Sequence, residues 1–392
     1  MLTYARKIWQ RRRELLPARG FYFDRPLVVL QSDDWGRVGL RDQEGFDQLR
    51  AGGLDLGANP YDLYTLETAE DLAALRAVLN RHRDASGRAA CIVMNFIVAN
   101  LDFAKMRAEQ FQQIHLLPLD QGVPENWRRP GLLEAYHDGI AEGTFYPALH
   151  GVTHFCRAAV ERHLEKSEDR RALLQTLWQA ETPYIYWRMP WIGFEYWDPE
   201  QPRDEQFLDA ERQQKLIGQA VGLFTRFFSM LPRSACAPGY RANKDTHHSW
   251  ARHGIHTAQS GPGAYTPPQM GRYGLLHLFR TIEFEPATDR KFSLEFCVRR
   301  ARECFQRGVP AIFSVHSINF HSSVRDFRTS TLKYLDELLS ALESSHPDLL
   351  YLHDEDLYQL VKKESYEAAS GPVHVQVTKK TFIPAWTTRD KR

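Results

Sequence analysis

The stretch LQSDDWG, residues 30–36, joins an apolar run to two adjacent carboxylates and a glycine. The apolar run predicts a buried strand over residues 26–31, so Asp33 and Asp34 follow at its carboxyl end. In α/β barrels, active sites form at that end of the strands. One of two neighbouring carboxylates can bind a metal while the other accepts a proton. By itself an Asp-Asp pair is more often a turn or a helix cap, so the rest of the chain has to support this interpretation.

Short apolar runs alternate with helical patterns along most of the chain, which is typical of βα units around a mainly parallel sheet. Further strands are predicted at 90–97, 145–149, 234–237, 256–259, 278–284, 311–315 and 349–352. Helices are predicted near 68–82, 103–113, 129–142, 205–229, 243–253, 291–307, 327–345 and 354–363. About eight units predict an α/β barrel in a single domain with insertions. The glycine-rich phosphate loops of nucleotide-binding proteins are missing after the early strands.

Composition narrows the class of partner. The 50 basic and 49 acidic side chains leave a net charge of +1, which offers no field to gather nucleic acid. The five cysteines are scattered and odd in number, which argues against a disulfide framework. No stretch has the apolar length of a secretory signal or a membrane span, so we expect a cytoplasmic protein and a small or neutral partner.

Three segments fall outside the repeating pattern. Residues 1–24 are rich in arginine and predict a helical extension, which covers one end of the barrel or lies on a membrane surface. The barrel itself is expected over 25–363. Within it, 182–202 (TPYIYWRMPWIGFEYWDPEQP) reads as an ordered aromatic insertion, suited to stacking on sugar rings or to plugging the barrel. Residues 364–392 are expected to form a tail or docking arm.

Two further strand ends deliver histidines. The run FYPAL leads into His150-Gly151-Val152-Thr153-His154 at the start of a helical pattern, which predicts two imidazoles one turn apart on the same side, as a metal site needs. The run AIFSV leads into His316, followed by Asn319 and Phe320. Each signal is weak alone, because a lone histidine after a strand is usually structural. Three such strand ends in one chain indicate a site.

With these motifs the chain resembles the polysaccharide deacetylase family, also called carbohydrate esterase family four. Its first motif is an Asp-Asp pair after a strand, its second is His-x-x-x-His, and its last is a strand-borne histidine; here they read SDDWG, HGVTH and VHSIN. The resemblance spans roughly residues 25 to 360 and implies a distorted barrel of about seven βα units. Segments such as CAPGYRAN (236–243) and RTIEFEP (280–286) look closer to an envelope-sugar branch.

The resemblance implies a role for each motif residue. Asp34, His150 and His154 would bind the metal, Asp33 would act as general base and His316 as general acid. Two imidazoles and one carboxylate suit Zn²⁺, with Co²⁺, Ni²⁺ or Mn²⁺ as alternatives. A backbone N–H near Tyr240 would hold the developing oxyanion. The residues expected to line the pocket or contact substrate are Trp35, Asn95, Arg188, Glu195, Tyr240, Arg241 and Asn319.

The chain also departs from the family. An arginine usually precedes the third motif, where this chain has Cys236, and Arg241 is either its substitute or a surface residue. The fourth motif, an Asp and Trp pair that supports the acid histidine, has no clean match. The candidates to orient His316 are Asp245, Glu283 and Glu285. A carboxylate there would raise the pKa of the imidazole and keep it protonated.

The sequence therefore predicts a metal-dependent carbohydrate deacetylase, a hydrolase that removes an acyl group, most readily N-acetyl, from a sugar. The expected cytoplasmic location favours a nucleotide-linked or lipid-linked precursor as substrate, with peripheral membrane contact left open. Two alternatives remain: an inactive carbohydrate-binding relative of the same fold, and a metal amidohydrolase that acts on a non-sugar amide.

Overall fold

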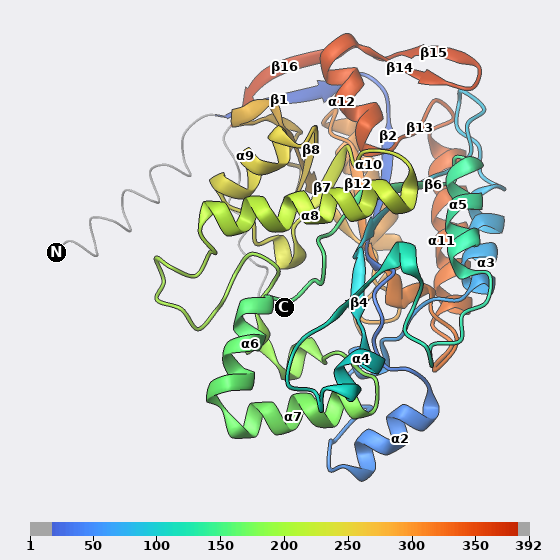
Figure 1. Ribbon diagram of the computed structural model, residues 1–392. Helices are drawn as coiled ribbons and strands as arrows, with labels where there is room; N and C mark the ends of the chain where they lie inside the picture. Colours follow the sequence, from blue (N-terminus) through green and yellow to red (C-terminus); the bar gives the residue numbers. More distant parts are fainter. Residues whose placement is uncertain (1–17, 383–392) are drawn as a thin grey trace.

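The computed structural model describes residues 18–382 (Figure 1). Its central strands occupy the apolar runs of the sequence, where side chains of both faces are buried. The run expected at 278–284 is divided at Thr281 into two strands. The strands of the central sheet are β2 (Leu27–Trp35), β3 (Ile92–Phe96), β6 (Phe145–Leu149), β7 (Ser234–Cys236), β8 (Thr257–Pro262), β9 (Gln269–Met270), β10 (Leu276–Arg280), β11 (Ile282–Glu283), β12 (Ala311–His316) and β13 (Leu350–Tyr351).

Parallel pairing closes these strands into a ring. Hydrogen-bonded neighbours run from β12 through β2, β3, β6, β7 and β8 to β10. Immediately after Thr281, β11 pairs with β12, so the chain bridges the two ends of the row. Between β6 and β7 the described pairing is a single pair, Leu149 with Ala235, which marks where the barrel is distorted. The expected distorted barrel with seven strand positions is confirmed.

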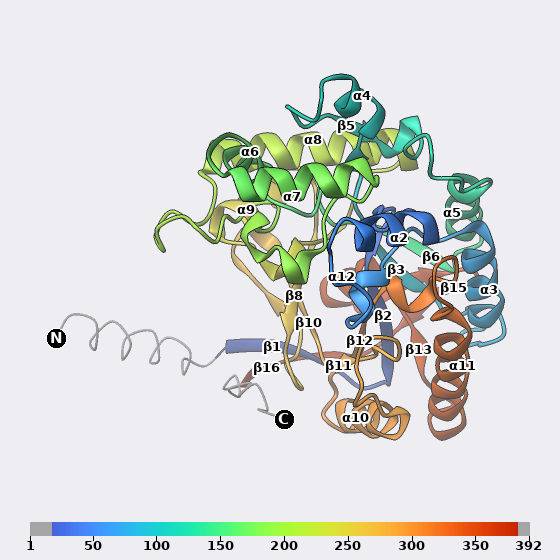
Figure 2. The same ribbon diagram turned by 90° about the horizontal axis from the view of Figure 1, so that it is seen from below.

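Helices follow most strands and cover the outside of the barrel (Figure 2). Local signals set their first turns: Thr68 and Asp71 form a capping box before α3, and Asp209 caps α8. The helices near the predicted positions are α3 (Ala69–Leu79), α4 (Phe103–Ala108), α5 (Leu132–Ala141), α8 (Ala210–Phe228), α9 (Lys244–Arg252), α10 (Leu294–Gln306), α11 (Arg328–Ser345) and α12 (Asp354–Lys363).

Three helices were not expected from the sequence. They are α2 (Gln43–Ala51), α6 (Arg157–Lys166) and α7 (Glu168–Gln179), and they lie at the lower end of Figure 1, together with α4. This is the end at which β2 finishes, so these additions surround the carboxyl ends of the strands. No helix in the described range 18–382 is long and apolar enough to cross a membrane.

The two ends of the described chain differ from expectation. The helical extension predicted over 1–24 is wrong for 18–23, which form β1 (Ala18–Phe23), paired antiparallel with β16 (Val377–Phe382). Phe21 and Phe23 alternate with a more exposed Tyr22, which is the period of a strand. Residues 1–17 lie outside the described residues.

The predicted tail is ordered as far as Phe382. It contains β14 (Ser365–Ala368) and β15 (Gly371–His374), which pair with each other, and then β16. Tyr366 and Val375 anchor this segment because both are buried against α12. The remainder, 383–392, lies outside the described residues. A separate short hairpin joins β4 (Ala99–Leu101) to β5 (Leu116–Pro118).

The inside of the barrel changes character along its axis, because successive side chains of a strand alternate between the two faces. Val29, Val93 and Ile312 form an apolar layer beside α12. Two residues further along each strand stand the polar side chains Gln31, Asn95 and Ser314, and two further along β2 and β12 stand Asp33 and His316. The ionisable groups are thus gathered at the carboxyl end.

Candidate active site

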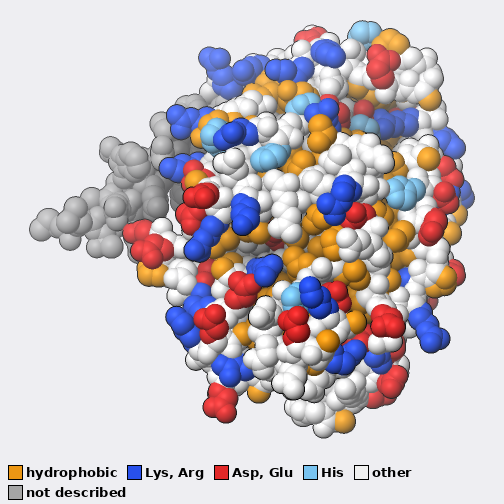
Figure 3. Space-filling view, in the orientation of Figure 1, with side chains coloured by type: hydrophobic (Ala, Val, Ile, Leu, Met, Phe, Trp, Pro, Cys, Tyr) orange, Lys and Arg blue, Asp and Glu red, His pale blue; other side chains and the backbone are white. Residues whose placement is uncertain are grey.

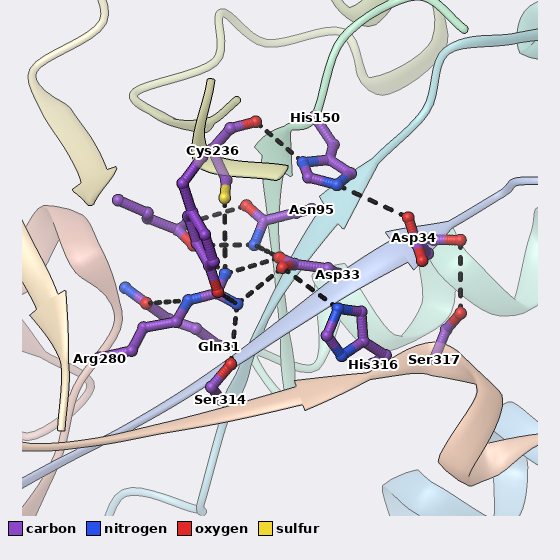
Figure 4. Close-up of polar contacts among 12 residues, drawn as sticks. Gln31, Asp33, Asp34, Asn95, His150, Cys236, Arg280, Ser314, His316 and Ser317 are labelled. Atoms are coloured by element: carbon purple, nitrogen blue, oxygen red, sulfur yellow. Dashed lines mark hydrogen bonds and ion pairs between the residues drawn. The ribbon is translucent and has the colours of Figure 1, made fainter. Parts of the chain in front are cut away.

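Asp33 and Asp34 are consecutive but face different surroundings (Figure 4). The pairing of β2 with β3 shifts register between Ser32 and Trp35, and Asp34 has a φ of 75°. A left-handed conformation costs an aspartate about 1–2 kcal/mol, so the rest of the site has to hold it there. As a result Asp33 points into the barrel and Asp34 borders a cavity at its end.

Asp34 and the two histidines of HGVTH form a set of converging donor atoms. The Nε2 atoms of His150 and His154 lie 3.6 Å and 3.3 Å from Asp34 Oδ1. One ligand atom from each residue falls within 4.8 Å of the other two. His150 Nδ1 donates to the carbonyl oxygen of Cys236 at 2.8 Å, which fixes the ring with Nε2 toward Asp34. Asp34 Oδ1 is buried and has no hydrogen-bond partner among the described residues.

The two histidines do not share a helix, so that expectation was wrong. Residues 150–156 form a loop, and α6 begins only at Arg157. Gly151 has a φ of 109° and His154 a φ of 70°, neither of which fits a right-handed helix. The imidazoles nevertheless approach each other, with ring centroids 5.4 Å apart.

Glu195 explains why this loop is stable. Its carboxylate accepts hydrogen bonds from the backbone N–H groups of Val152, Thr153 and His154, each at 3.0 Å. Thr153 Oγ1 adds a fourth at 3.2 Å. Successive N–H groups that point at one anion replace the bonds of a helix. Glu195 belongs to the aromatic insertion, so the insertion supports the loop from behind rather than lining the cavity with this residue.

Asp33 is held by a guanidinium that we did not predict. Arg280, at the end of β10, donates from Nη1 to Asp33 Oδ2 and from Nη2 to Oδ1, both at 2.6 Å, and Asn95 Nδ2 donates to Oδ1 at 2.7 Å. Burial alone would raise the pKa of Asp33, but Arg280 holds it well below its usual range. Asp33 is therefore ionised at neutral pH.

Arg280, rather than Arg241, reaches the place where the resemblance expects an arginine. Arg280 Nη2 lies 3.7 Å from Cys236 Sγ. Arg241 instead packs over the ring of Trp197, with its guanidinium carbon 4.3 Å from the ring centroid. Burial raises the pKa of the Cys236 thiol, so this side chain is neutral beside the ion pair.

His316 faces the same space from β12. Its Nδ1 lies 2.6 Å from Glu285 Oε1, and Asn319 Nδ2 donates to Glu285 Oε2 at 2.6 Å. Burial lowers the pKa of His316, but Glu285 outweighs it and raises the pKa to about 9. Of the other two candidates, Glu283 is exposed and Asp245 lies in the first turn of α9; within 18–382 neither forms a hydrogen bond or ion pair with His316.

A cavity of about 270 Å³ opens beside these groups. Asp34, His154 and His316 form part of its lining, and six of the other lining residues are aromatic. The other lining residues are Arg37, Gly39, Leu40, Tyr61, Asp62, Tyr64, Thr182, Tyr184, Ile185, Tyr186, Trp187, Phe194 and Gly239. The sequence missed Arg37, whose guanidinium lies 3.3 Å from Asp34 Oδ2 and donates to Tyr184 Oη at 2.8 Å.

The residues expected to contact substrate mostly lie elsewhere. Trp35 is fully buried and stacks on Phe320, and Asn95 is fully buried beneath Asp33. Asn319 supports Glu285, as described. The backbone N–H of Tyr240 donates to Ala237 O at 2.8 Å, so it is not free to hold an oxyanion. None of the five predicted substrate contacts, Trp35, Asn95, Tyr240, Arg241 and Asn319, lines the described cavity.

No protein-family model matches the chain, and no curated protein matches it. Solved structures do resemble it. A protein from Mycobacterium smegmatis assigned as a polysaccharide deacetylase has 10% identity and a TM-score of 0.45, covering 89% of this chain and 95% of its own. A family 4 carbohydrate esterase from Streptomyces lividans in complex with acetate has 10% identity and a TM-score of 0.34, with coverages of 84% and 92%. A pseudoenzyme of the same family from Bacillus anthracis has 9% identity and a TM-score of 0.36, with coverages of 85% and 65%.

Proposed function

We propose that this chain is a metal-dependent deacylase that hydrolyses an acyl group, N-acetyl in the first place, from a sugar. One arrangement carries the proposal: a ligand set, a carboxylate paired with a guanidinium and an imidazole paired with a carboxylate lie next to one another at the carboxyl ends of the strands. Asp34 provides the carboxylate of the ligand set, and His316 Nε2 lies 4.0 Å from Asp33 Oδ2. Metal-assisted hydrolysis of an acyl group uses these three elements together, a Lewis acid, a base for the water and an acid for the leaving group.

The residues present fit a divalent cation. Asp34 Oδ1 is buried without a hydrogen-bond partner in the described chain, and two imidazole Nε2 atoms face it. Burial lowers the pKa of His154 to about 3, so this ring is neutral as a ligand must be. Asp33 raises the pKa of His150 against the effect of burial, so a cation must displace a proton there. When bound, a divalent ion polarises an acyl carbonyl and makes water more acidic.

The donor set favours zinc. Catalytic zinc sites of other hydrolases use two imidazoles and one carboxylate, so Asp34, His150 and His154 would hold this ion. The same nitrogen and oxygen donors also accept Co²⁺, Ni²⁺ or Mn²⁺.

Asp33 is proposed as the general base. Arg280 and Asn95 donate hydrogen bonds to the two carboxylate oxygens of Asp33 and fix its orientation. The guanidinium keeps the group ionised, so it can accept the proton of an attacking water. Fixed orientation matters because a base has to lie within hydrogen-bond reach of the proton that it removes.

His316 is proposed as the general acid. With a pKa of about 9 it carries a proton at neutral pH. Nδ1 is committed to Glu285, which leaves Nε2 as the proton donor to the leaving nitrogen or oxygen. Of the three carboxylates considered, Glu285 is thus the one proposed to orient the acid.

The lining of the cavity supports a sugar over a non-sugar amide. Tyr61, Tyr186 and Phe194 offer flat apolar faces, which pack against the C–H faces of a sugar ring. On the face shown in Figure 3, acidic and basic side chains are interspersed, which does not suit a polyanion such as nucleic acid. A nucleotide or lipid carrier for the sugar, and a cytoplasmic location, stay predictions.

An inactive binding protein would not need to preserve this arrangement. Asp33, Asp34, His150, His154 and His316 are all present and converge, which favours an enzyme over the pseudoenzyme alternative.

Elemental mass spectrometry on the purified protein tests the proposal, with Asp34→Ala and His154→Ala as comparisons. We expect about one divalent ion per wild-type chain, lost in both variants, together with loss of acetate release from N-acetylated sugars and from 4-nitrophenyl acetate. A wild-type protein that holds no metal and takes up no added Zn²⁺, Co²⁺, Ni²⁺ or Mn²⁺ would contradict it.

A further inference from the structure

We infer that the cavity is a dead end that admits one acylated sugar ring, presented as a free or carrier-linked monosaccharide or as the last ring of a chain. This inference rests on the proposed function and concerns the form in which substrate arrives. It depends on how the aromatic insertion joins the segment that precedes β3.

Two segments far apart in the sequence make the walls. Residues 182–194 contribute six lining side chains, and residues 61–64 contribute three on another side; the floor holds Asp34, His154 and His316. The lining residues of the two walls are Tyr61, Asp62 and Tyr64, and Thr182, Tyr184, Ile185, Tyr186, Trp187 and Phe194.

Hydrogen bonds join the two walls at the outer edge of the cavity. Trp187 Nε1 donates to Asp62 Oδ1 at 2.9 Å, and Arg188 Nε donates to the same oxygen at 3.2 Å. Arg188 also donates to the carbonyl oxygen of Asp55, and its guanidinium lies over the Trp187 ring, 4.1 Å from the centroid. The side chain of Asp62 is fully buried. A buried carboxylate that accepts hydrogen bonds from both Trp187 and Arg188 is costly to separate from them, so this tie is a fixed part of the structure.

Asp62 is itself held rigidly on its own wall. Its Oδ2 accepts from the N–H groups of Gly57 at 2.9 Å and Asn59 at 3.3 Å, and it completes the capping box of the short helix η1 (Pro60–Leu63). The tie therefore connects two ordered segments rather than two free side chains.

A second tie lies deeper. Arg37 donates to Tyr184 Oη on one wall, and its guanidinium stacks on Tyr64 of the other, 3.7 Å from the ring centroid. The walls are thus joined at two depths. A polymer that crosses a site needs a groove open at both ends, and in the inferred arrangement these contacts close one of them.

The size of the cavity agrees with a single ring. At about 270 Å³ it falls just below the usual range of roughly 300–1,000 Å³ for sites that hold drug-sized ligands. Trp187 is 42% exposed although its indole nitrogen is tied to Asp62. The exposed part of the Trp187 indole can stack on the group attached to the bound sugar ring, which is a second sugar or a carrier.

The test compares where the metal-loaded enzyme acts on N-acetylglucosamine and on its β-1,4-linked tetramer, with the deacetylated rings located by tandem mass spectrometry. We expect release from the monosaccharide or from one terminal ring, and internal rings at least about tenfold slower. Hydrolysis of 4-nitrophenyl acetate is followed in parallel, because it reports the acyl chemistry without a sugar.

The double variant Trp187→Ala, Arg188→Ala cuts the tie at the outer edge of the cavity. We expect it to raise the share of internal deacetylation while metal content stays the same. Trp191→Ala is the matched control: Trp191 lies on the same insertion, packs on His163 and Arg170, and does not line the cavity. This variant should keep the wild-type pattern. If the double variant folds poorly, as its 4-nitrophenyl acetate rate would reveal, the wild-type pattern alone decides.

The outcomes separate the two proposals. Equal rates at internal and terminal rings in the wild type would overturn the dead-end inference and leave the deacylase standing. Activity on 4-nitrophenyl acetate but on neither sugar would overturn the inference that the cavity admits an acylated sugar ring. Absence of both activities in a metal-loaded protein would overturn the proposed function itself.

Discussion

The two carboxylates of SDDWG both belong to β2 but contact two different kinds of structure. Asp33 is surrounded by side chains from the barrel strands, chiefly Arg280 and Asn95. Asp34 is surrounded by loop residues, and the loop that carries His154 depends on Glu195 of the insertion. The proposed proton transfer therefore depends on barrel residues, whereas the proposed metal binding and the shape of the cavity depend on added segments. We call the residues around Asp33 the barrel half of the site and those around Asp34 the loop half. Variants of the two halves should lose different properties.

Asp33→Asn should give the clearest separation. The substitution keeps the shape of the side chain and removes the base, so we expect turnover to fall by about 10²–10⁴. Metal content should stay at the wild-type level because Asp33 lies outside the proposed ligand set. Steady-state kinetics and elemental analysis of the same sample measure both. An active Asp33→Asn enzyme would remove Asp33 from its role, and loss of metal would mean that the two halves are not separate.

Arg280→Met tests how far the barrel half depends on one ion pair. Removal of one partner of a buried pair typically costs about 3–5 kcal/mol in the free energy of unfolding, because Asp33 would stay buried and charged. Urea denaturation measures this loss. Arg241→Met is the control, since Arg241 is exposed and packs on Trp197, and its denaturation midpoint should barely move. Equal shifts of the denaturation midpoint in the two variants would show that the Arg280–Asp33 pair adds nothing to the free energy of unfolding beyond an exposed arginine.

Glu195→Gln tests the loop half. A glutamine offers one acceptor oxygen in place of two, and its NH₂ group would face an N–H of Val152 or Thr153. We expect metal affinity to fall about 10–100-fold, as for other residues that orient ligands from behind. Competition with a chelator of known affinity measures it. Glu200→Gln, on the same insertion but paired with Arg170, should bind metal as the wild type does.

Glu285→Gln acts on the proposed acid alone. In the metal-free protein we expect His316 to titrate at about 9, and the variant to titrate closer to the ordinary value near 6.5. Because the folded pKa is raised, the Glu285–His316 pair stabilises the fold fully below about pH 6.5 and loses this contribution as pH rises through about 9. NMR titration of the imidazole measures the shift. Glu283→Gln is the control, and an unchanged titration in Glu285→Gln would exclude Glu285 as the cause.

Local sequence was sufficient for the central strands and for the motif residues that meet at their carboxyl ends. Each strand is a short apolar run, and Asp33, Asp34, His150 and His316 follow such runs directly. Parallel strands bring their carboxyl ends together, so the convergence of these residues could be expected without knowledge of their contacts.

The rest depends on partners that no local pattern contains. Arg280 stands 247 positions from Asp33, and Glu195 stands 41 from His154. The loop conformation of HGVTH follows from that distant carboxylate, which is why a helical pattern was misleading. One signal was available: Arg280 ends an apolar run like the other site residues, and strand alternation would have turned it into the barrel.

The hydrogen bonds of Glu195 limit how the sequence of this protein can change. The same short segment shapes the cavity with Tyr184, Tyr186 and Phe194 and holds the loop of His154 in place. A change of substrate preference that rebuilds this segment will also alter how firmly metal is retained. Grafting a foreign insertion here would succeed only if the graft returned a carboxylate to the position behind the loop, so selectivity and metal retention are inherited together.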